Sequence, residues 1–92
     1  MTPERAETLA LQALAWLAAN DELWPVFLGS SGSTPDAALA GARDPAYLGS
    51  VLEFLTMDDA WVMAFCDEAG LKYDDPLTAR YALPGAGKVE WT

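Results

Sequence analysis

The feature that most constrains the fold of this 92-residue chain is a helix-capping residue followed directly by proline, which occurs four times. A Thr or Asp side chain accepts hydrogen bonds from the free backbone N–H groups of a first helical turn, while proline at the next position needs no N–H and already has a helical φ. Each pair therefore predicts the start of a helix. The four pairs are Thr2-Pro3, Thr34-Pro35, Asp44-Pro45 and Asp75-Pro76.

Further caps and breaks divide the rest of the chain. The first helix is expected over residues 3–19. Asp21 then caps a short second helix, which Gly29 ends because glycine adopts the left-handed conformation without strain. A last short helix follows Pro76 and stops at Pro84, which cannot continue a helix.

Residues 44–71 carry the strongest pattern in the sequence. Apolar residues recur there at i, i+3, i+4 and i+7, the spacing of one helix face: Leu48, Val51, Leu52 and Leu55. A single continuous helix would place Asp58 and Asp59 in the apolar stripe, and burying unpaired carboxylates is costly. We therefore expect Asp58 to cap a new helix over residues 59–69 that Gly70 ends.

The composition favours helix over sheet. Ala and Leu supply 30 of the 92 residues, Ile is absent and Val occurs four times, and β-branched side chains lose χ1 freedom in a helix. We predict an all-α fold, a compact bundle of about five helices, some short, with orthogonal or irregular packing. Residues 1–84 form its single helical domain, and residues 85–92 form a flexible C-terminal tail that frays or docks through Trp91.

The charge of the chain limits its partners and its chemistry. Fourteen acidic residues against five basic ones give a net charge of −9, and there is no histidine. Such a charge repels nucleic acids and anionic membranes, so a basic or apolar protein surface, including a second copy, is the expected partner. Without histidine, Ser-His-Asp triads, zinc hydrolases and imidazole proton shuttles are excluded. We expect no cofactor and no bound metal.

The sequence also predicts a cytoplasmic location. The N-terminal apolar run follows Glu4, Arg5 and Glu7, whereas a secretory signal begins with a positive segment. No stretch reaches the roughly 18 uninterrupted apolar residues of a membrane span. The single cysteine, Cys66, cannot form an internal disulfide, which fits a reducing compartment.

Two glycine-rich segments resemble phosphate-binding loops superficially. Residues 29–33 read Gly-Ser-Ser-Gly-Ser and precede a helix start, but no lysine follows them and Asp36 in the first helical turn would repel an anion. Residues 85–88, Gly-Ala-Gly-Lys, have no adequate helix beside them. We interpret the first segment as a connector between two helices.

Acidic residues concentrate in the last third of the chain, at Asp58, Asp59, Asp67, Glu68, Asp74 and Asp75. They lack the regular ligand spacing and sharp glycine turn of a calcium loop, so we interpret them as helix caps and a solvated rim. Cys66 lies on the apolar face of the same region. Because negative neighbours raise the pKa of a thiol, we expect a buried, unreactive structural cysteine.

The ten aromatic side chains are the strongest indication of binding. A small domain has a limited interior, and tryptophans at a surface are typical interface anchors. A large aromatic core would explain the same residues equally well. As candidate interface residues we single out Trp24, Phe27, Trp61 and Trp91.

Three segments of the chain carry a resemblance to a known family. The run Leu-Ala-Leu-Gln-Ala-Leu-Ala-Trp-Leu-Ala at 9–18, the block at 44–71 and Ala-Arg-Tyr-Ala-Leu-Pro-Gly at 79–85 resemble a small family of uncharacterised alphaproteobacterial proteins catalogued as a domain of unknown function. The resemblance covers roughly residues 3–85. It implies a compact helical domain with no assigned activity and transfers no catalytic or binding residues.

These observations favour one function over two alternatives. We predict a non-enzymatic protein–protein interaction module that buries an aromatic and leucine-rich patch on assembly, by self-association or with another protein. The first alternative is a small-ligand-binding protein or an enzyme that uses paired carboxylates beside a pocket lined by Trp24 or Trp61. The weaker alternative is a nucleic-acid mimic whose acidic face occupies a basic DNA-binding surface.

Overall fold

The computed structural model describes residues 1–84, and this part of the chain folds into six helices without a strand. The predicted all-α class is confirmed, with one helix more than the five expected. The predicted tail, residues 85–92, lies outside the described residues. The helices are α1 (Pro3–Ala18), α2 (Leu23–Ser31), α3 (Pro35–Gly41), α4 (Pro45–Leu55), α5 (Asp59–Ala69) and α6 (Asp75–Ala82).

Side-chain caps start four of these helices where the sequence predicts them. The hydroxyl of Thr2 accepts from the backbone N–H of Arg5 at 3.2 Å, and that of Thr34 accepts from Ala37 at 3.1 Å. The carboxylates of Asp44 and Asp58 accept from the N–H two residues ahead, at 3.0 and 2.8 Å. The division of residues 44–71 at Asp58 into α4 and α5 is therefore confirmed.

Two predicted caps were wrong. Glu22 precedes α2 directly and makes no side-chain capping bond, and it is Asn20, not Asp21, whose side-chain oxygen accepts from the N–H groups of Glu22 and Leu23, both at 3.0 Å. Asp75 is already the first residue of α6, and its carboxylate accepts from the backbone N–H of Lys72 at 3.1 Å. It thus fixes the turn before α6 instead of capping the helix from outside.

The end of α2 also differs from the prediction. The helix continues through Gly29 to Ser31, and the left-handed residue is Gly32, with φ of 68°. The hydroxyl of Ser31 donates to the carbonyl of Phe27 at 2.8 Å, and the N–H of Gly32 closes the helix on the carbonyl of Leu28. The serine-rich segment is therefore the last turn of a helix followed by a short connector.

This difference predicts opposite effects for two alanine substitutions. Gly29→Ala should raise the free energy of unfolding by about 0.5–1 kcal/mol, because position 29 is helical and a Cβ there meets no atom within 4 Å. Gly32→Ala should lower it by about 1–2 kcal/mol, because the left-handed conformation strains alanine. Urea unfolding curves measure both. A loss at position 29 with none at position 32 would mean that α2 ends at Gly29.

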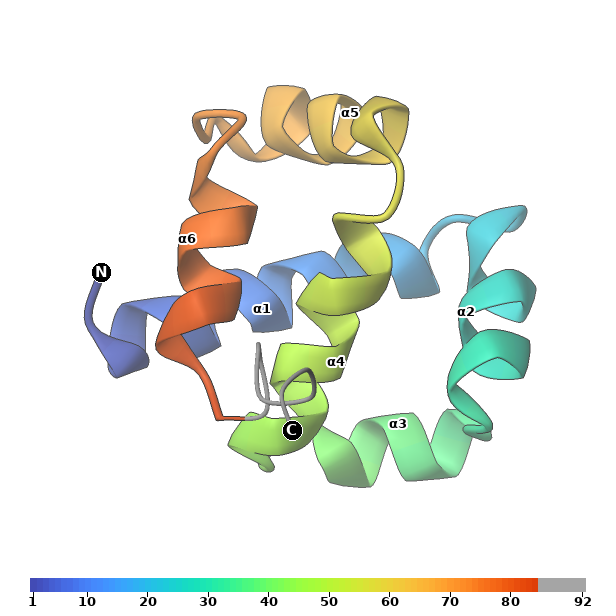
Figure 1. Cartoon of the computed structure of the whole chain (residues 1–92). Helices are drawn as coiled ribbons and strands as arrows, with labels where there is room; N and C mark the ends of the chain where they lie inside the picture. Colours follow the sequence, from blue (N-terminus) through green and yellow to red (C-terminus); the bar gives the residue numbers. More distant parts are fainter. Residues whose placement is uncertain (85–92) are drawn as a thin grey trace.

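The first helix is the centre of the bundle. α4 and α6 cross in front of α1, α5 lies over one end of this layer, and α2 and α3 close the other side (Figure 1). α1 contacts α2, α4, α5 and α6, and α4 also contacts α3 and α6. Three small residues of α1 are completely buried and allow its neighbours to approach closely: Ala6, Ala10 and Ala13. The packing is irregular because the helices lie in several directions.

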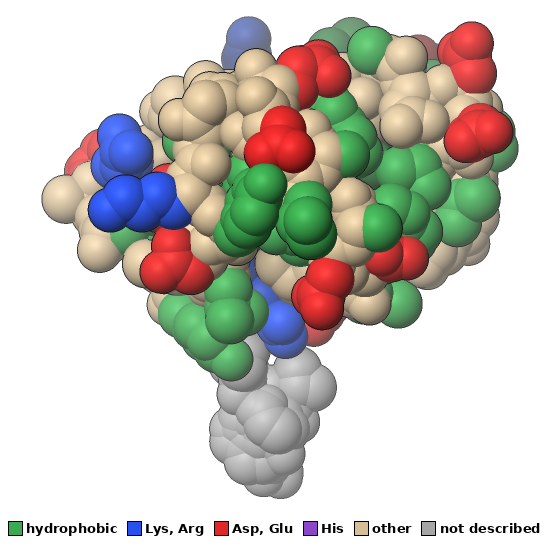
Figure 2. All heavy atoms as spheres, turned by 90° about the horizontal axis from the view of Figure 1, so that it is seen from above, with side chains coloured by type: hydrophobic (Ala, Val, Ile, Leu, Met, Phe, Trp, Pro, Cys, Tyr) green, Lys and Arg blue, Asp and Glu red, His purple; other side chains and the backbone are tan. Residues whose placement is uncertain are grey.

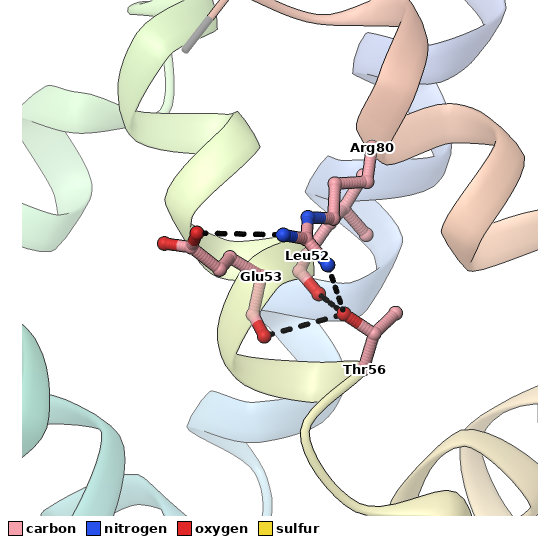
Figure 3. A network of polar contacts seen from close by, with 4 residues as sticks. All are labelled: Leu52, Glu53, Thr56 and Arg80. Carbon is pink, nitrogen blue, oxygen red and sulfur yellow. Dashed lines mark hydrogen bonds and ion pairs between the residues drawn. The ribbon is translucent and has the colours of Figure 1, made fainter. Parts of the chain in front are cut away.

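A polar contact joins α6 to α4. The guanidinium of Arg80 reaches across to α4, where one nitrogen lies 3.6 Å from the carboxylate of Glu53 and the other 3.5 Å from the hydroxyl of Thr56 (Figure 3). That hydroxyl itself donates to the carbonyl of Leu52 at 2.8 Å. The contact orients α6 on α4 and neutralises Arg80 within the fold.

The length and composition of the helices bear on membrane insertion. The longest helix, α1, has 16 residues. Within residues 1–84, none of the helices combines the length and the apolar character needed to cross a bilayer.

Candidate functional site

Three of the four candidate interface residues belong to one row of stacked rings. Trp24 of α2 stacks on Phe27 at 5.8 Å between ring centroids, and Phe27 meets the edge of Phe54 of α4 at 5.3 Å. Phe54 in turn stacks on Trp61 of α5 at 4.9 Å. We call these four residues the aromatic row; it runs from α2 through α4 to α5.

The members of the row differ in their access to solvent. Phe27 is 0% exposed, so it lies in the core behind Trp24 and not at the surface where the sequence analysis placed it. Trp24 and Trp61, at the two ends of the row, are partly buried and keep some exposed surface. Trp91 lies outside the described residues. The two partly exposed tryptophans at the ends of the row therefore pack against the buried rings of Phe27 and Phe54.

An apolar groove lies beside Trp24, between α1, α2 and α3. Its volume is about 300 Å³, and every lining side chain is apolar. The lining residues are Leu11, Leu14, Ala15 and Ala18 of α1, Trp24 of α2, and Pro35, Ala38 and Leu39 of α3. Because Trp24 rests on Phe27, the wall that it forms is rigid.

Two leucines of the apolar groove are exposed to solvent. Leu39 is 76% exposed and Leu11 is 42% exposed. Fully burying a leucine side chain stabilises a fold by about 1.5–3 kcal/mol. Because these two leucines stay exposed to solvent, the folded chain does not gain much of this stabilisation from them.

The surroundings of the apolar groove are acidic. Between Arg5 and Arg43 the chain has no lysine or arginine, and it has four acids, Glu7, Asp21, Glu22 and Asp36. In Figure 2, a view from above onto the α5 side of the molecule, no Lys or Arg side chain is visible at the right, toward α2, where acidic and hydrophobic side chains lie among uncharged ones. The groove is thus an apolar surface in a negative setting.

The acidic cluster in the last third of the chain has structural roles at several positions. Asp58 caps α5, and Asp75 fixes the turn before α6. Asp67 accepts a hydrogen bond of 2.6 Å from the Tyr73 hydroxyl, and this bond is the main cause that raises the pKa of Tyr73. Throughout residues 1–84, no group of three or more His, Cys, Asp and Glu side chains is arranged to hold a metal ion.

Cys66 is completely buried, as the sequence predicts. Its thiol donates to the carbonyl of Lys72 at 3.3 Å. Burial raises the pKa of this thiol above its ordinary value of 9.0, and the charges of Asp75, Asp67 and Asp74 raise it further. The thiolate that reacts with electrophiles is therefore disfavoured, and access to it is blocked.

A comparison with protein-family models gives a match over residues 3–86, to a family described as "Protein of unknown function (DUF3572)". The chain belongs to this family. Comparisons with curated proteins and with solved structures give no match. The resemblance noted in the sequence is thus confirmed at the level of a domain of unknown function, and the alphaproteobacterial origin stays a prediction.

The apolar groove of this DUF3572 chain has no chemically reactive lining. None of its lining side chains is ionisable or nucleophilic, so the groove supplies no general acid, base or nucleophile. What it offers is apolar surface with one rigid aromatic wall.

Leu11 and Leu39 were not among the interface residues predicted from the sequence. Leu11 stands between Thr8 and Ala15 on the polar or small side of α1, and this break in the amphipathic pattern was the available signal. Leu39 is the largest side chain of the short helix α3. No local pattern indicated that these two leucines share a groove.

Proposed function

We propose that this DUF3572 chain is a non-enzymatic protein–protein interaction module and that the apolar groove is its contact surface. The observation that carries the proposal is the exposure of Leu39 and Leu11 in the same groove as Trp24, formed by three helices. Protein interfaces centre on an aromatic anchor surrounded by apolar contacts that exclude water. Trp24, held in place by Phe27, has the features of such an anchor.

A carboxylate-based enzyme has weaker support. The hollow between α5 and α6, about 330 Å³, combines two acids with an aromatic residue, because Asp59, Asp74 and Tyr73 line it. However, the Tyr73 hydroxyl already donates to Asp67, and its raised pKa makes it a poorer acid. The hydrogen bond from Tyr73 to Asp67 ties the turn before α6 to α5, so the Tyr73 hydroxyl is not a free acid.

The proposal includes a cytoplasmic setting, because the single buried thiol of Cys66 is compatible with a reducing compartment. It also includes two kinds of partner that the sequence suggests, a second copy of the chain and a basic or apolar surface of another protein. Both would cover the same exposed leucines.

The experiment that tests the proposal places a photo-crosslinking amino acid at position 39 of the full chain in its native cells. The matched control carries it at position 77, where Leu77 is also exposed, at 42%, but lines the α5–α6 hollow. We expect one discrete crosslinked protein species from position 39 and none from position 77. Equal crosslinking from both positions, or none from position 39, would contradict the apolar groove as a contact surface.

A further inference from the structure

We propose that the occupant of the apolar groove is a basic amphipathic helix of another protein, and not a second copy of this chain. This inference rests on the proposed function and specifies its partner. Three properties of the groove carry it: its shape, the charges beside it and the absence of bases to neutralise those charges.

The shape of the apolar groove suits a helix. Leu11, Trp24 and Leu39 contribute apolar surface from three different helices, α1, α2 and α3, to one open hollow. A helix that binds in a groove inserts apolar side chains spaced i, i+3 or i+4 and i+7 along one face. About 12 residues of helix span about 18 Å, which fits within the 30 × 28 × 22 Å extents of the molecule.

The acids beside the groove belong to, or directly precede, the same three helices that line it. Glu7 lies one helical turn before Leu11 on the same face of α1. Asp21 and Glu22 directly precede α2, and Asp36 is in the first turn of α3, next to Pro35. A partner helix seated on the apolar residues would bring its flanking side chains close to these carboxylates.

None of these carboxylates forms an ion pair with a residue of the described part of the chain. Across residues 1–84 the one ion pair joins Arg80 to Glu53, on α6 and α4. Glu7 is partly buried, and the other three groove acids are exposed. Lys and Arg on the polar face of a partner helix would supply the missing positive charge, which would speed association and select this partner over acidic ones.

The same charges oppose a second copy. Each chain carries a net charge of −9, and two grooves facing each other would bring their acids together. Like charges placed opposite each other across an interface are unfavourable. A small apolar ligand is also a poorer occupant, since pockets for such ligands bury most of the ligand surface, whereas this groove leaves Leu39 largely exposed.

The test uses two synthetic peptides and the full chain. The first is a helix of about 18 residues, five turns, with leucine on one face and lysine elsewhere. The second has glutamate in place of each lysine. At about 0.15 M salt, where distant charges are screened, calorimetry should show the lysine peptide binding at least about tenfold more tightly than its acidic twin. Its affinity should fall as salt rises.

Two variants separate groove binding from general attraction to an acidic protein. Leu39→Asp should weaken binding of the lysine peptide by at least about tenfold. Leu77→Asp adds the same negative charge on α6 and should not weaken it. If both variants bind the peptide as tightly as the original chain or more tightly, the peptide adheres through charge alone and the inference fails.

Three further outcomes would overturn the inference, with different consequences for the proposed function. If light scattering gives twice the 9.9 kDa mass of the chain and Leu39→Asp restores the monomer, the occupant is a second copy and the interaction function stands. If neither peptide binds and no protein crosslinks to position 39, both the inference and the proposed function fail. If the two peptides bind equally tightly, the partner does not have to be basic; the inference then fails, whereas the proposed interaction function stands.

Discussion

Replacing Phe27 with alanine is expected to lower the free energy of unfolding by about 3–5 kcal/mol. The ring is 0% exposed and packs against Trp24, Tyr47 and Phe54, with centroid distances of 5.8, 6.3 and 5.3 Å. Its removal leaves a cavity at the junction of α2 and α4 that the surrounding rings cannot fill without moving. A domain of this size is expected to have a total stability of about 5–9 kcal/mol, so the variant would retain little of it.

Urea unfolding monitored by circular dichroism measures this loss. Met57→Ala is the matched control, because Met57 is 70% exposed and its truncation should change stability by less than about 0.5 kcal/mol. A Phe27→Ala variant that unfolds like the original chain but no longer binds its partner would contradict the burial of Phe27. It would return this residue to the interface role that the sequence suggested.

The sequence predicts the helices well because their signals are local. Thr2, Thr34, Asp44 and Asp58 cap helices within three residues of their own positions, so the chain nearby contains all the information required. Asn20 and Asp21 are both good caps and stand side by side, so composition alone could not choose between them. The structure selects Asn20 because its side chain reaches the N–H groups at the start of α2.

The candidate site was less predictable because it depends on contacts between distant segments. Trp24 and Phe27 lie three residues apart on one face of α2, and no property of α2 alone tells which is covered. Phe54, which is 27 positions from Phe27 in the sequence, packs on Phe27. Likewise Leu11 and Leu39 share the apolar groove only because α1 and α3 are brought together by the fold.

Gly41→Val is expected to lower the free energy of unfolding by about 2–3 kcal/mol. A Cβ at position 41, the last residue of α3, would lie 2.5 Å from ring carbons of Tyr47. The ring cannot easily yield, because its edge-to-face contact with Phe27 and the 3.2 Å hydrogen bond from its hydroxyl to Ser33 hold it from two sides. The strain would therefore displace α3, which carries Leu39, and weaken binding at the apolar groove as well.

Two comparisons assign this effect to the contact with Tyr47. Gly29→Val is the matched glycine control; a Cβ there meets open space, so its stability should change by less than about 0.5 kcal/mol. In a Tyr47→Ala background, Gly41→Val should cost far less than in the original chain, since neighbouring residues couple in a double-mutant cycle. If the cost is the same in both backgrounds, the penalty comes from the backbone of α3. In that case α3, which forms one wall of the apolar groove, would not need glycine at position 41 to pack against α4.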